Sequence, residues 1–249
     1  MKKPTIAAFL LCIATMSHAQ NNDIVRIFTP SKTYAFLTTD VDSITFGGIC
    51  PDNNHPHAID MGLSTKWACC SVGAEAPEEE GIYYAWGETH TKDYFWYDEY
   101  EFYDEENEEC TLRIDISGTK YDAAFVNWND NWVMPTKAAA EELLQNCTWT
   151  LTKYHNVNGF IVTAPNGQCL FFPLSGGYAL TQKIDYDKLG YYWLSTPAEN
   201  EMAYVLQFNS RNKYANIEPT YPQIGLLVRP VKRTFRPQTG ESLNSVQCE

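Results

Sequence analysis

A single well-marked amphipathic helix is the feature that most limits how this chain can fold. Pro135 and Thr136 give the start signals of a helix, and apolar residues then recur at the i, i+3, i+4 and i+7 spacing of one helical face. The residues of this stripe are Ala140, Leu143, Leu144 and Cys147. A shorter helix is predicted to begin after Asp122, whose side chain would cap its first turn. Elsewhere the pattern is one of short strands and turns.

Two β-hairpins are predicted from this pattern. Residues 159–163 and 169–172 are strand-like and flank a Pro-Asn-Gly turn at 165–167. Near the N-terminus, residues 24–28 and 34–37 flank a Pro- and Ser-containing turn in the same way. The predicted fold class is therefore α+β, with helices preceding most of the strands.

The 249 residues are enough for one large domain and a small appendage, because a single core can grow to roughly 250 residues before it splits. Residues 48–57 are dense in Gly, Pro and Asn and have no apolar period, which is typical of a linker. The predicted organisation is a signal peptide at 1–19, a small β-rich module at 20–47, the linker at 48–57, a main domain at 58–232 and a flexible C-terminal tail at 233–249.

The first 19 residues read as an export signal. Lys2 and Lys3 precede an apolar run from 6 to 14, and Ser17-His18-Ala19 has the small-x-small form of a cleavage site. The apolar run is well short of the roughly 20 residues that span a bilayer, and no later segment is long and apolar enough. We expect an exported protein without a membrane span, located in the periplasm, on the outer cell surface or in the medium.

The chain is strongly acidic. Loss of Lys2 and Lys3 with the signal would leave 16 basic against 31 acidic residues, a net charge of −15. Such a surface repels phosphate backbones, so nucleic acid is not an expected partner. Eight acids fall within residues 98–109, which indicates a solvated loop. A calcium site there stays open as an alternative, although the EF-hand spacing is absent.

The cysteines and histidines predict no metal site. Seven cysteines would remain after cleavage, an odd number whose pairing cannot be deduced from spacing. Cys69 and Cys70 are adjacent, so on a strand at most one of them would face the core. His55 and His57 lie in the Pro-broken linker without two further clustered ligands, and we expect them to be solvated.

Five stretches, in order along residues 58–232, resemble the Fibrobacter succinogenes major paralogous domain family, which is common in secreted proteins of Bacteroidetes. They are residues 59–68, 81–89, 128–136, 190–196 and 225–231. The resemblance implies a C-type-lectin-like domain with a twisted antiparallel sheet and one to two helices, preceded here by a small β-hairpin module. It also implies that Trp193 is a core residue near paired terminal strands. Asp42-Ser43-Ile44 resembles the Bacteroidetes O-glycosylation signal, with Ser43 as the acceptor.

The same resemblance raises an enzymatic alternative, because the family is similar to the formylglycine-generating-enzyme branch of this fold. Those enzymes use a late pair of cysteines to bind copper, and this chain has no cysteine between Cys169 and Cys248. A triad for serine-hydrolase chemistry is also missing. We therefore expect no catalytic residues, no enzyme activity and no cofactor.

A late segment rich in tyrosine and asparagine is the predicted ligand surface. These residues offer large amphipathic contact area with adaptable hydrogen bonding. The predicted contacts are Tyr191, Tyr192, Asn200, Glu201, Asn209, Arg211, Asn212, Tyr214, Asn216 and Tyr221. The function predicted from the sequence is a secreted or cell-surface binding module for a glycan or protein ligand. A structural adhesin or fimbria-tip-like subunit and a divergent formylglycine-generating-type oxidoreductase are the alternatives.

Overall fold

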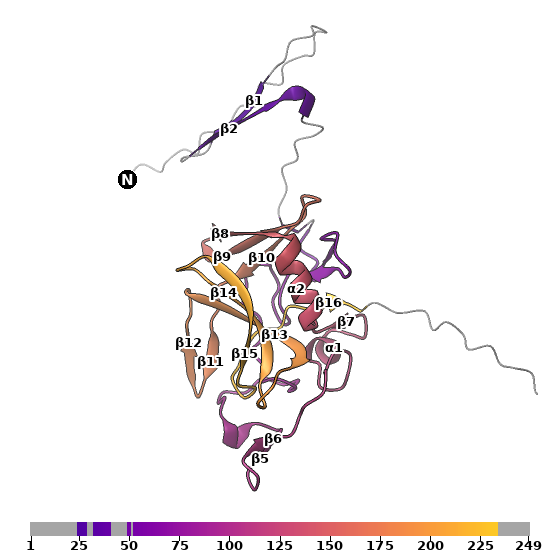
Figure 1. Cartoon of the computed structure of the whole chain (residues 1–249), viewed down its shortest axis with the longest axis vertical. Coiled ribbons are helices and arrows are strands. Elements are labelled where there is room, and N and C mark those ends of the chain that lie inside the picture. The colour runs from indigo at the N-terminus through magenta and orange to yellow at the C-terminus, as the bar shows by residue number, and fades with distance from the viewer. Residues whose placement is uncertain (1–23, 29–31, 41–48, 51, 234–249) are drawn as a thin grey trace, which may run out of the picture. The chain divides into compact units, whose positions relative to one another are not determined.

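The computed structural model describes residues 24–28, 32–40, 49–50 and 52–233, and the chain divides into two units, 1–46 and 47–249 (Figure 1). Its class is α+β, as predicted, with most of the regular structure in short antiparallel strands. Within the described residues, no helix is long and apolar enough to cross a membrane. The predicted signal peptide, Ser43 and the C-terminal tail from 234 onward lie outside the described residues.

The first unit contains the predicted N-terminal hairpin. Strand β1 (Ile24–Phe28) pairs antiparallel with β2 (Thr33–Leu37), and a short 3-10 helix, η1 (Thr38–Asp40), follows. Nearly all side chains of both strands are exposed. Among the described residues of this unit, no further layer lies against the two strands to bury a face.

Two three-stranded antiparallel sheets build most of the second unit. The first has the order β10-β9-β8, and the second the order β13-β14-β15. The strands are β8 (Thr148–Tyr154), β9 (Val157–Thr163), β10 (Cys169–Pro173), β13 (Leu189–Pro197), β14 (Ala203–Asn209) and β15 (Tyr214–Thr220). The β9–β10 pair is the hairpin predicted around 165–167.

A small four-stranded sheet joins the two ends of the domain. Its order is β3-β4-β16-β7, with β3 (Ala58–Ile59), β4 (Trp67–Ala68), β16 (Val231–Lys232) and β7 (Trp132–Val133). Two small hairpins complete the unit, β5 (Tyr103–Asp104) with β6 (Glu109–Cys110) and β11 (Gly177–Ala179) with β12 (Gln182–Ile184). A 3-10 helix, η2 (Tyr97–Glu99), precedes β5.

Both predicted helices are present and begin where their caps were predicted. The Thr136 hydroxyl caps α2 (Lys137–Asn146), which buries Ala140 and Leu143 completely. Asp122 caps α1 (Ala123–Asn127) by accepting from the amides of Ala124 and Phe125. Its second oxygen accepts from two amides outside the helix, those of Gly118 and Met134, each at 2.8 Å. Burial raises the pKa of Asp122, against the opposing effect of these backbone hydrogen bonds.

The core of the second unit is dense in aromatic rings. Phe172, Tyr192 and Phe208 meet at ring-centroid distances between 5.2 and 5.9 Å. Trp193 is fully buried, as predicted. Gly190 makes the close packing possible, because a β-carbon at this position would lie about 2 Å from the Phe208 ring. The side chain of Arg229 is also fully buried within this unit.

The segment predicted to be a linker packs against the domain over its described part, residues 49–50 and 52–57. Ile49 is buried, and Cys50 packs against the main hydrophobic cluster. The Gly, Pro and Asn content correctly indicated irregular backbone. It did not reveal that Ile49 and Cys50 anchor that backbone to the core.

We predict that Asp122→Ala lowers the free energy of unfolding by about 3–5 kcal/mol, since it removes a helix cap and leaves buried amides without acceptors. Urea denaturation followed by circular dichroism measures this loss. Asp130→Ala is the matched control, because Asp130 is exposed. Equal stability of the two variants would contradict the structural role of Asp122.

Candidate functional site

The strand register gathers part of the predicted ligand surface on one face of the β13-β14-β15 sheet. Tyr191 lies opposite Gln207, and Gln207 opposite Asn216. Asn209 lies opposite Tyr214 in a neighbouring row of the same face, because alternate residues of a strand point the same way. We call this group, with Glu218, the polar sheet face. Tyr214 is its most exposed ring, at 57%.

Tyr192 is a correction to the predicted surface. It points to the opposite face of the sheet from Tyr191 and is only 1% exposed. Its hydroxyl donates to the carbonyl oxygen of Pro173 at 3.1 Å, and its ring stacks on Phe208. Burial raises its pKa. Tyr192 is therefore a core residue, because its face of β13 packs against the Phe172 and Phe208 rings.

The predicted turn residues lie at opposite ends of the same sheet. Asn200 and Glu201 form the β13–β14 turn, and Arg211 and Asn212 lie in the β14–β15 turn. Strands of seven residues separate these ends by about 20 Å. Tyr221, just after β15, belongs to the end with Glu201. The predicted residues therefore do not form a single patch.

Glu201 anchors the acidic segment to the sheet. One of its carboxylate oxygens accepts from the backbone amide of Cys110 at 2.9 Å, and the other pairs with Arg113 at 3.2 Å. Both partners lie in or just after β6, so Glu201 fixes the β5–β6 hairpin. Its side chain is already engaged in this structural role.

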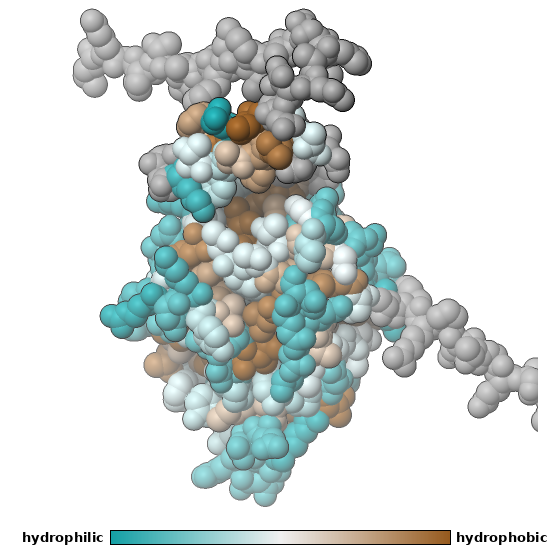
Figure 2. All heavy atoms as spheres, turned by 45° about the horizontal axis from the view of Figure 1, so that its top comes forward, coloured by the Kyte–Doolittle hydropathy of each residue, from teal (hydrophilic) through white to brown (hydrophobic). Residues whose placement is uncertain are grey.

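The acidic residues 98–109 form that hairpin, which projects from the lower end of the domain in Figure 1. Figure 2 shows hydrophilic residues gathered at the same end. The Asp104 carboxylate closes the tip of the hairpin by accepting from the Asn107 side chain and from the amides of Glu106 and Asn107, which lowers the pKa of Asp104. The solvated character predicted for this segment is observed, in a defined hairpin.

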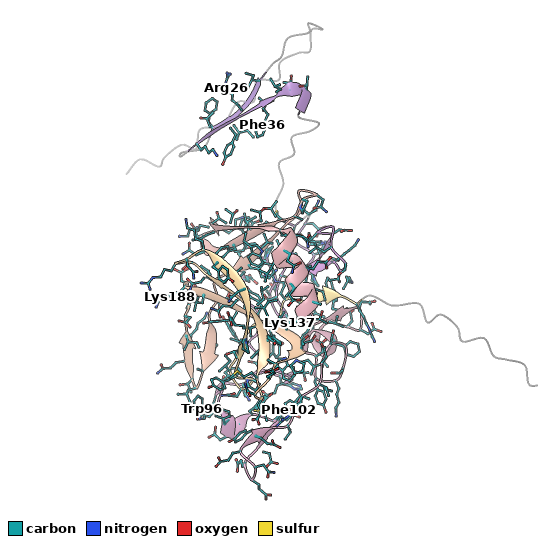
Figure 3. The ribbon with its side chains drawn as sticks, viewed as in Figure 1. Arg26, Phe36, Trp96, Phe102, Lys137 and Lys188 are labelled. Carbon is teal, nitrogen blue, oxygen red and sulfur yellow. The ribbon has the colours of Figure 1, made fainter. Side chains whose placement is uncertain are left out.

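Four aromatic rings form a contiguous surface where this hairpin meets the end of the sheet. Trp96 contacts Tyr97 at a ring-centroid distance of 5.4 Å, and Tyr97 contacts Tyr103 at 5.1 Å and Tyr221 at 6.5 Å. Trp96 and Tyr221 are 40% and 53% exposed. Figure 3 labels Trp96 beside β5 and β6. We call Trp96, Tyr97, Tyr103 and Tyr221 the aromatic patch.

The aromatic patch is bordered by acceptors and donors of hydrogen bonds. Asp98 and Glu99 follow Tyr97 directly and are exposed. Desolvation and the nearby Glu108 carboxylate raise the pKa of Tyr103, whose hydroxyl is a hydrogen-bond donor. Of the four rings, only Tyr221 was predicted. The missed signal was the interleaving of aromatic residues with acids before and within 98–109.

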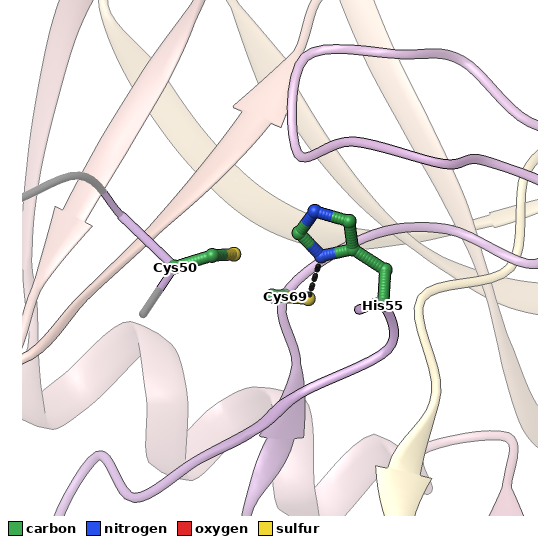
Figure 4. A group of neighbouring side chains, drawn as sticks. All are labelled: Cys50, His55 and Cys69. Carbon is green, nitrogen blue, oxygen red and sulfur yellow. Dashed lines mark hydrogen bonds between the residues drawn. The ribbon is translucent and has the colours of Figure 1, made fainter. Parts of the chain in front are cut away.

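A second grouping contains residues that were not predicted to act together. Sγ of Cys50, the imidazole of His55 and Sγ of Cys69 offer ligand atoms that all lie within 4.8 Å of one another (Figure 4). His55 was expected to be solvated but is half-buried, with Nδ1 3.2 Å from Cys69 Sγ. This group is the Cys–His cluster.

Cys69 and Cys70 also differ from expectation, because both are fully buried. They follow β4 in a bend instead of extending it. The alternation that would send one of them outward therefore does not apply.

The chain matches none of the family models, curated proteins or solved structures with which it was compared. Its chemistry is therefore inferred from the side chains that its own fold brings together. The aromatic patch and the Cys–His cluster are the two such groupings with a recognisable chemical capacity.

Because Tyr192 is buried and Tyr214 is exposed, we predict that their loss changes the free energy of unfolding by very different amounts. Tyr192→Ala should lower the free energy of unfolding by about 3–5 kcal/mol, since it leaves a cavity in the core. Tyr214→Ala should change it by less than about 0.5 kcal/mol, since the ring is exposed. Thermal or urea unfolding of both variants measures the difference, and a large loss for Tyr214→Ala would place that ring in the core.

Proposed function

We propose that the protein is an exported, non-catalytic binding module whose aromatic patch contacts a glycan. The observation that carries this proposal is the set of four rings in which Tyr97 contacts the other three, with Trp96 and Tyr221 well exposed and exposed acidic residues alongside. Tyrosine and tryptophan combine a flat apolar ring with a polar group, which suits a sugar that has an apolar face and a rim of hydroxyls. Ionised carboxylates accept hydrogen bonds from those hydroxyls.

The charge of the chain narrows the class of glycan. Acidic residues lie beside the patch. The chain as a whole carries a formal net charge of −13. Sialylated, sulfated or uronic-acid-rich glycans would be repelled by such a surface. A neutral glycan is the ligand that this chemistry favours.

The patch is held in place before any ligand binds. The Tyr100 hydroxyl, next to η2, donates to the carbonyl oxygen of Trp86 at 2.8 Å. Lys92 reaches the carbonyl oxygen of Glu99, at the end of η2, at 2.6 Å. Together with the Glu201 anchor of the hairpin, these contacts reduce the entropy that binding would otherwise cost.

We further propose that residues 58–232 form a C-type-lectin-like domain of the major paralogous family. Three features support this assignment. β4 near the start of the domain pairs with β16 at its end, α2 packs near β13 and β15, and Trp193 lies in the core.

The alternative of a structural adhesin subunit would require assembly with other chains, and the edge of the β13-β14-β15 sheet does not favour it. β15 is an edge strand in the described structure, which makes it the natural place for another chain to add a strand. Glu218 and Pro219 interrupt this edge with a charge and with a residue that lacks an amide hydrogen. Both features discourage assembly by strand addition.

The test begins with a neutral-glycan array probed with the mature protein, followed by calorimetry on the best ligand. Trp96→Ala and Tyr221→Ala should each weaken binding by about 1–3 kcal/mol, as expected for exposed aromatic hot spots, with little change in stability. Tyr214→Ala is the matched control, because it removes a ring of similar exposure at the other end of the sheet. If Tyr214→Ala weakens binding while Trp96→Ala does not, the ligand contacts the polar sheet face instead.

A further inference from the structure

The Cys–His cluster stands at the point where the described chain enters the main domain. Cys50 and His55 come from the irregular segment before β3, and Cys69 comes directly after β4. Figure 4 shows the three side chains converging from these two segments. The cluster therefore links the irregular segment before β3 to the bend after β4.

The sulfur of Cys69 is the centre of the cluster. The His57 backbone amide donates to it at 3.1 Å, and Nδ1 of His55 lies 3.2 Å away. An N–H donor to a sulfur is the kind of outer contact that orients thiolate ligands of metals.

A buried positive charge lies beside these sulfurs. Arg229 is fully buried, and its guanidinium donates to the carbonyl oxygens of Cys69 and Phe171. Among the described residues it forms no ion pair with a carboxylate. An unpaired buried cation lowers the cost of ionised sulfur nearby.

We propose that Cys50, His55 and Cys69 bind a zinc ion. Two thiolates and one imidazole form a donor set that zinc prefers over magnesium or calcium, which take oxygen ligands. In a tetrahedral site with Zn–S bonds of about 2.3 Å, ligand atoms lie about 3.5–3.8 Å apart. The atoms of the cluster already lie within 4.8 Å of one another, so a shift of about 1 Å brings them to the distances of such a site.

Two thiolates neutralise the dication, and three protein ligands leave a fourth position open. The ion would cross-link Cys50 and His55 to the bend that follows β4. Zinc binding at this place is independent of the aromatic patch, so the two proposals can fail separately.

The test uses the whole mature chain, recovered by export, stripped of metal and titrated with Zn²⁺ in competition with a chromophoric chelator. We expect one zinc ion per chain, a rise in Tm with zinc concentration, and thiolate-to-metal charge-transfer absorption when Co²⁺ replaces Zn²⁺. His55→Gln should weaken zinc binding by roughly 100-fold or more, since loss of even an outer-sphere contact costs 10- to 100-fold. Cys69→Ser should have an effect at least as large.

Cys169→Ser is the matched control, because Cys169 is a half-buried cysteine outside the cluster, and it should leave zinc affinity unchanged. His55→Gln decides the matter if Cys69→Ser fails to fold, since His55 is partly exposed and circular dichroism can verify the fold. Absence of stoichiometric zinc binding, or equal affinity of wild type and His55→Gln, would overturn the proposal. A peptide map without reductant that links Cys50 to Cys69 as a disulfide would overturn it too.

Discussion

A guanidinium buried in the middle of the main domain must find its hydrogen-bond acceptors among backbone carbonyls when no carboxylate is at hand. Arg229 does so at Cys69, which follows β4, and at Phe171 in β10, while its cationic plane lies 4.6 Å from the centre of the Phe172 ring. These contacts join the β3-β4-β16-β7 sheet to the β8-β9-β10 sheet. Together with the contact between the Trp67 and Phe172 rings, this cation fixes the position of β4 relative to β10, and with it the location of the buried thiols.

Features encoded by neighbouring residues could be predicted from the sequence, because a helix cap or a tight turn needs only a few residues. The caps Asp122 and Thr136 and the β9–β10 hairpin are of this kind. The hydrogen bonds that Asp122 accepts from outside α1 could not be predicted. Its bond to the Met134 amide depends on how β7 lies against α1, which no local pattern encodes. The lectin-like topology inferred from the family resemblance remains a proposal.

The candidate sites were harder to predict because their members are distant in sequence. Strand alternation separates Tyr191 from Tyr192 but does not say which of the two faces the core. Tyr221 meets Tyr97 across more than a hundred residues, so the density of tyrosines in 191–221 identified one ring of the aromatic patch and missed three. Cys50 and Cys69 lack the close spacing of familiar zinc motifs, and only the bend after β4 turns both Cys69 and Cys70 inward.

The pairing of β4 with β16 also has a consequence for the order in which the domain can form. Val231 pairs with both Trp67 and Val133, and Arg229 reaches carbonyl oxygens about 160 positions earlier in the chain. Contacts of such sequence separation slow folding, because the entropy of closing the loop is lost before the contacts form. During synthesis, β4 and β7 have no strand between them until the final segment of the domain emerges. The early part of the domain must therefore stay incompletely packed, and exposed to aggregation or to chaperones, until its last strand arrives.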